Sequence, residues 1–134
     1  MPSLIPLPLS SHAKPVDSFS RARELEEALK RAVRGEVRFD RGSRALYATD
    51  GSNYRQIPIG LVIPRDPEDV AAAMAVCRQF DAPVLARGAG TSLAGQCCNV
   101  AVVFDYTKYL NQVVEANPAA RFARVQPGLV LDRL

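Results

Sequence analysis

The stretch Arg87-Gly-Ala-Gly-Thr-Ser-Leu-Ala-Gly-Gln96 directly follows the apolar run of residues 83–86. Its glycines, at positions 88, 90 and 95, permit positive φ angles and let a loop direct several backbone N–H groups toward one point. An anion can therefore come close to the main chain, and Thr91, Ser92 and Gln96 can add side-chain hydrogen bonds. The stretch predicts a phosphate-binding loop, and the alternative interpretation is a flexible surface loop.

Two familiar kinds of phosphate-binding loop do not fit. A Walker A loop requires lysine and then serine or threonine after its last glycine, but Gln96 and Cys97 follow Gly95. The dinucleotide fingerprint G-x-G-x-x-G requires a third glycine where Leu93 stands, and it should open a helix. The chain leads instead into residues 100–104, an apolar run typical of a strand. We therefore expect a glycine-rich loop between two strands.

Residues 60–134 resemble the start of the flavin-binding domain of the vanillyl-alcohol oxidase superfamily. The loop 87–96 and the later Arg124-Val-Gln-Pro-Gly128 are most similar to the glycolate oxidase flavin subunit and the FAD-linked D-lactate dehydrogenases. A weaker similarity extends back to Tyr47-Ala-Thr-Asp50. In that family the loop wraps the FAD pyrophosphate and the Pro-Gly turn lies near the flavin ring. The expected cofactor-binding residues are Arg87, Gly88, Ala89, Gly90, Thr91, Ser92, Gly95, Gln96, Asp105, Thr107, Pro127 and Gly128.

Two of these residues, Asp105 and Arg87, have a second interpretation. Asp105 and Thr107 follow a buried strand at its carboxyl end, where ligands sit in open α/β sheets, and this makes them candidate flavin contacts of second rank. Asp105 can equally cap the short turn of residues 106–110. Arg87 can balance the pyrophosphate charge, or it can extend to solvent from the end of its strand.

The resemblance implies oxidation of a 2-hydroxy acid of the D-lactate or glycolate type by hydride transfer to FAD. Relatives with covalent flavin place a histidine just after the Gly-x-Gly stretch, where this chain has Thr91, so we expect non-covalent FAD. No catalytic residue is expected here, because the single histidine, His12, lies far from the motifs and no acid–base set is present. The alternative is a nucleotide- or flavin-binding module without turnover. The sequence of the loop is also similar to that of relatives fused to an iron–sulfur module. An iron–sulfur cluster in a C-terminal part of the protein is therefore an open alternative.

Composition indicates a globular piece and not a whole enzyme. The 134 residues, 48% hydrophobic and 23% charged, can bury one modest core. The resembled family needs further sequence, so we expect a truncated chain that self-associates through apolar surface and holds FAD weakly by itself. The net charge is +3, and the basic residues are scattered along the chain, with only residues 31–44 approaching a basic patch. Nucleic-acid binding is therefore not expected.

Three cysteines, at 77, 97 and 98, have no metal-site spacing and form no disulfide framework. We expect reduced thiols and no metal site in a cytoplasmic protein, with peripheral attachment to the inner face of the membrane as an alternative for the full-length protein. The electron acceptor is not indicated.

The predicted fold class is α+β: the N-terminal lobe of a two-lobed FAD-binding domain, with a mixed sheet and flanking helices. Residues 1–18 are expected to be a disordered lead-in, 19–56 a helix and an irregular segment, and 57–134 the first part of the domain. Asp66 as N-cap and Pro67 at the first position predict a helix whose apolar face contains Val70, Ala73, Met74, Cys77 and Phe80. With the strands on either side of it, this helix predicts a parallel pair. The expected regular segments are a helix at 19–34 and strands at 37–39, 61–63, 84–86, 100–104, 112–115 and 121–126.

Overall fold

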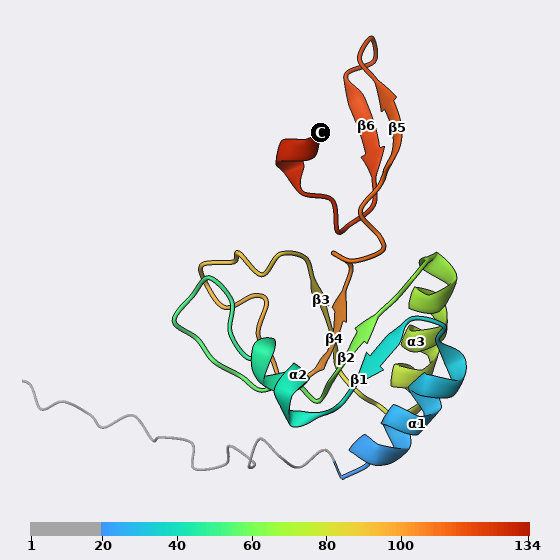
Figure 1. Ribbon diagram of the computed structural model, residues 1–134, viewed down its shortest axis with the longest axis vertical. Helices are drawn as coiled ribbons and strands as arrows, with labels where there is room; N and C mark the ends of the chain where they lie inside the picture. Colours follow the sequence, from blue (N-terminus) through green and yellow to red (C-terminus); the bar gives the residue numbers. More distant parts are fainter. Residues whose placement is uncertain (1–19) are drawn as a thin grey trace, which may run out of the picture.

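The computed structural model describes residues 20–134 (Figure 1). The expected lead-in at 1–18 and His12 lie outside the described residues. The helices are α1 (Ala22–Ala32), α2 (Arg41–Leu46), α3 (Pro67–Gln79) and the short 3-10 helix η1 (Leu131–Arg133). The strands are β1 (Glu36–Arg38), β2 (Gly60–Ile63), β3 (Val84–Arg87), β4 (Val102–Asp105), β5 (Val113–Asn117) and β6 (Phe122–Val125).

Four strands form a mixed sheet in the order β1-β2-β4-β3. β1 is antiparallel to β2, whereas β4 is parallel to both of its neighbours. The predicted α+β class, with a mixed sheet and flanking helices, is confirmed. The expected pairing of β2 with β3 is wrong in one respect, because β4 lies between them. Residues 88–101 are long enough to return the chain to the amino end of β3, and the most apolar run then takes a central position, buried at every residue.

Helices α1 and α3 cover one face of this sheet, and α2 lies with the long loops on the other side (Figure 1). Leu25 and Leu29 of α1 pack with Cys77 of α3 against Phe104 of β4, and these four side chains are almost completely buried. The predicted apolar face of α3 needs one correction. Met74 is 47% exposed, and the buried stripe runs instead through Asp69, Ala73, Val76 and Cys77.

A carboxylate belongs to that buried stripe. Asp69 is 2% exposed and accepts hydrogen bonds from the backbone N–H groups of Arg34, Gly35 and Arg65, at 3.0, 2.9 and 3.0 Å. Burial alone would raise the pKa of Asp69, but these donors outweigh it and hold the pKa below its ordinary value. The side chain thus joins the end of α1 to the beginning of α3.

Helix α2 lies where an irregular segment was expected. Its N-cap is Asp40, whose side chain accepts from the backbone N–H of Ser43 at 2.8 Å. Six residues with a glycine among them carry too little periodicity to be recognised as a helix, although the Asp-x-x-Ser capping position is visible in the sequence.

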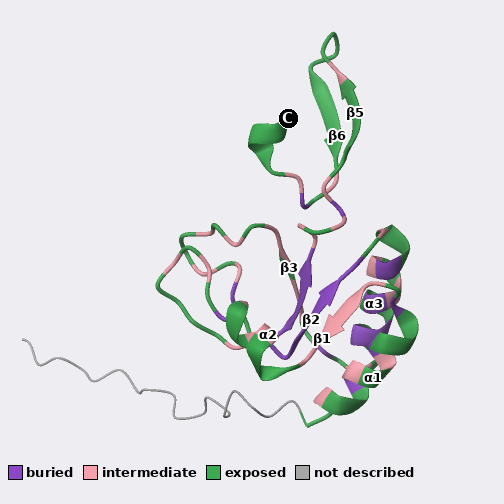
Figure 2. Ribbon diagram, in the orientation of Figure 1, coloured by how far each residue is buried: buried purple, intermediate pink, exposed green. Residues whose placement is uncertain are grey.

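Strands β5 and β6 form a separate two-stranded ribbon that projects beyond the sheet (Figure 1). The two strands were predicted, at 112–115 and 121–126, but they do not join the larger sheet. Their residues are almost all exposed (Figure 2), including Val114 at 59% and Phe122 at 44%. No helix within residues 20–134 is both long and apolar enough to cross a membrane.

Candidate functional site

The glycine-rich loop leaves the carboxyl end of β3 without entering a helix. Gly90 and Gly95 have φ angles of +72° and +80°, a region that side chains rarely adopt. Gly88, expected to share this conformation, does not have a positive φ. The loop therefore requires glycine for its backbone conformation at two of the three positions.

The two halves of the loop use their backbone donors differently. In the second half, Ala94, Gln96 and Cys97 donate to Gln96 Oε1, Ser92 Oγ and Asp50 Oδ2, at 3.3, 3.3 and 3.1 Å. In the first half, the N–H groups of residues 88–93 donate to no acceptor within the described chain. These six residues include most of the predicted phosphate contacts. The first half is therefore able to bind an anion, and the second half holds the loop closed.

Ser92 and Gln96 hydrogen-bond to each other. Their side chains thus stabilise the closed half of the loop, a role that the sequence did not suggest for them. Their expected contact with phosphate stays a prediction, as it does for Thr91 and Ala89, which are exposed.

Arg87 does not extend into solvent. Its Nη1 donates to the carbonyl of Cys97 at 2.9 Å and to that of Tyr47 at 3.4 Å, and its guanidinium lies 5.1 Å from the centre of the Tyr47 ring. A Cβ atom built on Gly90 would overlap Arg87 Nη2. The positive charge therefore lies directly against the loop backbone, where it favours an anion on the loop while also fixing the loop's two ends.

Residues 47–54 pack along the same loop. The N–H of Gly51 donates to the carbonyl of Gly90 at 2.9 Å, and a Cβ on Gly51 would lie 3.0 Å from the carbonyl oxygens of Thr91 and Ser92. A Cβ on Gly95 would lie 2.8 Å from the ring of Tyr54. Sequence reasoning missed this second wall, for which the only signal was the weak resemblance at 47–50.

Asp105 is 7% exposed and fully engaged with protein groups. Its Oδ1 accepts from the N–H and Oγ1 of Thr107, at 2.8 and 2.7 Å, and its Oδ2 accepts from the Tyr47 hydroxyl at 2.5 Å. Burial, and then this bond to Asp105, raise the pKa of Tyr47 to about 12. The structure thus shows Asp105 capping the turn after β4, as the alternative interpretation expected. A flavin contact by Asp105 or Thr107 remains a prediction.

The Pro-Gly turn lies beside the start of the loop. A Cβ on Gly88 would be 4.0 Å from the carbonyl oxygen of Pro127. Gly128 is buried, donates to the carbonyl of Leu110 at 2.8 Å, and would overlap the carbonyl of Tyr106 if it carried a Cβ. The space beside Gly128 is therefore occupied by the protein's own backbone, from Tyr106 and Leu110, and not by a ligand. Pro127 is the exposed member of the pair that can face a ligand.

The cysteine thiols take no part in the hydrogen bonds described above for the glycine-rich loop. Burial raises the pKa of Cys77 to about 11, and burial together with the nearby Asp50 raises the pKa of Cys98. Both thiols are buried, and all three cysteines are unpaired in the structure. Within residues 20–134, no group of three or more His, Cys, Asp or Glu side chains is placed to hold a metal ion.

Residues 58–134 match the protein family described as FAD binding domain. The chain is 36% identical over 115 residues to D-2-hydroxyglutarate dehydrogenase from Pseudomonas putida, covering 83% of this chain and 11% of that relative. It is 40% identical over 86 residues to the glycolate oxidase subunit GlcD of Escherichia coli K12, covering 62% of this chain and 17% of the relative. The chain thus spans less than a fifth of the length of these relatives.

Solved structures with low sequence identity share the fold. A p-cresol methylhydroxylase structure with substrate bound superposes with a TM-score of 0.71 at 16% identity, over 84% of this chain and 23% of the other. An alkyldihydroxyacetonephosphate synthase gives a TM-score of 0.68 at 18% identity, over 80% and 23%. At this level of identity the similarity concerns the fold alone.

Proposed function

The chain belongs to the FAD-binding domain family, and on that premise we propose that it forms the pyrophosphate-holding part of an enzyme that oxidises a 2-hydroxy acid with FAD. The predicted resemblance to the vanillyl-alcohol oxidase superfamily and its FAD cofactor are confirmed. The observation that carries the proposal is the run of N–H groups at residues 88–93 that the described chain leaves without an acceptor.

The residues present fit the diphosphate of FAD. Two positive-φ glycines set the loop conformation, the first half of the loop offers its backbone donors, and the Arg87 guanidinium lies against Gly90. Together they provide groups that a phosphate can use: a run of backbone N–H groups without an acceptor in the described chain, and a nearby fixed positive charge. Pro127 lies close to Gly88 and would form the border of the same binding surface, next to the start of the loop.

The proposed activity rests on the relatives. Their names are D-2-hydroxyglutarate dehydrogenase, glycolate oxidase subunit GlcD and, in Kluyveromyces lactis, mitochondrial D-lactate dehydrogenase. All three names refer to a 2-hydroxy acid, although the substrates differ in size and charge. We therefore propose the shared class, a 2-hydroxy acid, as the substrate of the full-length protein.

When bound, FAD would accept the hydride that leaves the carbon bearing the hydroxyl group. The residues of this chain would bind and orient the cofactor. Arg87 and the N–H groups of the loop would neutralise and fix the pyrophosphate, while Tyr47 and Asp105 hold the adjacent turn in place by their hydrogen bond. A base that receives the hydroxyl proton would have to come from outside this set, because Asp105 is already occupied by Tyr47 and Thr107.

Anaerobic flavin bleaching tests the proposal. The purified full-length protein is mixed with D-2-hydroxyglutarate, D-lactate and glycolate in turn, and the flavin absorbance is followed. Bleaching by at least one of these acids, and none by the corresponding 2-deoxy acids used as controls, is the expected result. Bound flavin that no 2-hydroxy acid bleaches would favour the alternative, a flavin-binding module without turnover.

Further parts of the proposal concern the whole protein. We propose that FAD is held without a covalent bond, since Thr91 occupies the position next to the Gly-x-Gly stretch. For this stretch taken alone, the exposed apolar side chains of the ribbon and of η1 favour self-association, with Leu131 exposed at 78% and Val114 at 59%. A cytoplasmic location, with peripheral attachment to the membrane as an alternative, and an iron–sulfur cluster outside this stretch complete the proposal.

A further inference from the structure

A cluster of charged and aromatic side chains joins the edge strand β1 to the turn of residues 106–110, which we call the bridging turn. Glu36 is the first residue of β1. Its carboxylate accepts a hydrogen bond from the Tyr109 hydroxyl at 2.9 Å and forms ion pairs with Lys108 and Arg38. One carboxylate at the edge of the sheet thus binds two consecutive residues of a turn that comes more than seventy residues later in the chain.

Glu36 is ionised at neutral pH. Its hydrogen bonds with Lys108, Arg38 and Tyr109 lower its pKa to about 2, although partial burial opposes them. The ammonium group of Lys108 also lies 5.1 Å from the centre of the Tyr109 ring, and the guanidinium of Arg65 lies 5.7 Å from that centre. The Tyr109 side chain is therefore held by its hydroxyl group and by two cations near its ring.

The bridging turn lies between the two predicted cofactor-binding segments. The N–H of Tyr106 donates to the carbonyl of Arg87 at 3.2 Å, where the glycine-rich loop begins. The carbonyl of Leu110 accepts from the N–H of Gly128 at 2.8 Å, and a Cβ on Gly128 would overlap the carbonyl of Tyr106. The Pro-Gly turn therefore packs directly on the bridging turn. A displacement of the bridging turn would move Pro127 relative to the loop.

The bridging turn is not packed on every side. A cavity of about 350 Å³ borders it, and residues of α3 and of the ribbon line that cavity together with Tyr106, Leu110 and Pro127. Asp105 holds the beginning of the turn by accepting from the N–H and the hydroxyl of Thr107. Glu36 holds its later part. The position of the turn thus depends on hydrogen bonds to two carboxylates.

We infer that Glu36 is a positioning residue of the cofactor site, an inference that rests on the proposed function. It fixes the bridging turn, and the bridging turn fixes Pro127 beside the loop, although Glu36 lies outside the predicted cofactor-binding residues. Charge alone predicts the opposite effect, because removing a negative charge should favour binding of the negatively charged pyrophosphate. The sign of the change in FAD affinity therefore separates positioning from simple electrostatics.

Fluorescence titration of the full-length protein with FAD, and visible circular dichroism at saturating FAD, test the inference. Glu36→Gln should bind FAD about fivefold or more weakly. The dichroism of its bound flavin should also change, because Pro127 has moved. Glu26→Gln is the matched control, since it removes a carboxylate that pairs with Lys30 on α1, and it should behave like the wild type.

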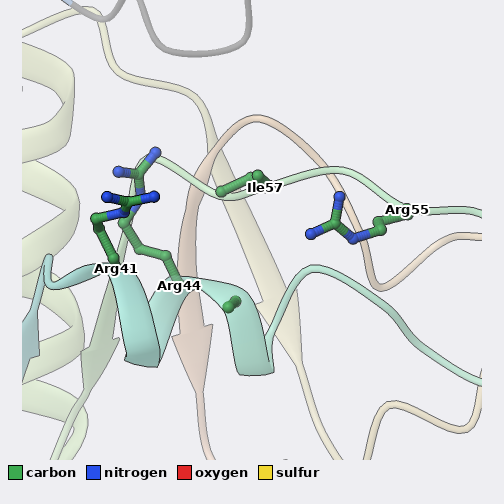
Figure 3. A pocket seen from close by; sticks show the side chains of 5 residues that line it. Arg41, Arg44, Arg55 and Ile57 are labelled. Atoms are coloured by element: carbon green, nitrogen blue, oxygen red, sulfur yellow. The ribbon is translucent and has the colours of Figure 1, made fainter.

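Three further variants separate positioning from charge and from misfolding. Tyr109→Phe removes only the hydroxyl group and keeps the ring, so it should fold normally and show part of the loss. Lys108→Gln should weaken FAD binding, whereas Lys108→Arg retains a cation and should restore it. Arg41→Gln measures the effect of a lost positive charge elsewhere and should cost less than Lys108→Gln. Arg41 is exposed on α2 and lines a different cavity, together with Arg44, Ala45, Arg55 and Ile57 (Figure 3).

Hydrogen exchange of the full-length protein before FAD is added gives a readout that does not need the cofactor. Peptides covering residues 106–112 and 126–130 should exchange faster in Glu36→Gln than in the wild type, and peptides from α3 should not. If the wild type bound no FAD, the proposed function and the cofactor part of the inference would fail. The exchange result would still decide whether Glu36 holds the two turns.

Other outcomes would overturn the inference directly. They are unchanged or tighter FAD binding by Glu36→Gln, unchanged dichroism of its bound flavin, unchanged exchange in both peptides, and an equal loss of affinity in Glu26→Gln. A loss in Lys108→Gln no larger than that in Arg41→Gln would also count against it, because charge alone would then explain the effect.

Discussion

Replacing Gly90 by alanine tests the assignment of the cofactor loop at its most constrained residue. Gly90 has a φ angle of +72°, so any side chain adds backbone strain of about 1–2 kcal/mol. The added methyl group would also overlap Arg87 Nη2. Arg87 must then move, and its hydrogen bond to the carbonyl of Cys97, 2.9 Å long, is weakened or lost.

A hydrogen bond from a charged donor contributes about 1.5–3 kcal/mol. With the strain included, the native loop conformation should lose about 3 kcal/mol or more, which corresponds to a roughly hundredfold lower affinity for FAD. The free energy of unfolding should fall by less, because the loop can rearrange locally while the sheet and helices stay folded.

Fluorescence titration of the full-length protein with FAD measures the affinity, and urea unfolding of the apo form measures the stability. Gly88→Ala is the matched control, because Gly88 has no positive φ and its nearest neighbour to a new Cβ is 4.0 Å away. That control should fold like the wild type, with a much smaller loss of FAD affinity. If Gly90→Ala bound FAD within about threefold of the wild type, the loop would not hold the cofactor as argued.

Asp69→Ala should lower the free energy of unfolding by about 3 kcal/mol or more in urea at pH 7, because three backbone donors lose a buried partner. Since the fold lowers the pKa of Asp69, its contribution is present above the ordinary value of 3.8 and is lost as the pH falls through the folded value, so the difference between variant and wild type should shrink in acid; a constant difference would argue against it. Spectrophotometric titration should find a tyrosine with a pKa of about 12 that is absent from Tyr47→Phe, and an unchanged titration curve in that variant would contradict the buried bond to Asp105. Acid precipitation of the holo-protein should leave FAD in the supernatant, whereas flavin that stays with peptides containing Thr91 would disprove non-covalent attachment.

The parts of the fold that follow a local rule could be predicted from the sequence. Helix α3 begins at Pro67 after the Asp66 cap, as expected, because capping is decided by a few neighbouring residues. The position of β4 between β2 and β3 could not be predicted, because it depends on how residues 88–101 cross the sheet. Asp69 stands in the first turn of α3, but its buried position depends on backbone donors more than thirty residues away in the chain.

The site shows the same division. The glycine pattern predicted a loop between two strands, and the positive φ angles of Gly90 and Gly95 fit that reading. Its partners from residues 47–54 were not predicted, since hydrogen bonds between distant segments leave no periodic signal.

β4, one of the two inner strands of the sheet, is also the last of the four strands to be synthesised. Until residues 102–105 arrive, β2 lacks one of its two neighbours and β3 has no partner strand, because each of them pairs with β4. During synthesis on the ribosome, at about 5–20 residues per second, the chain up to β3 would therefore expose the strand edges of β2 and β3 that β4 later covers. A nascent chain that stalls within the glycine-rich loop would present these unpaired strand edges to other chains, and only the arrival of β4 covers them.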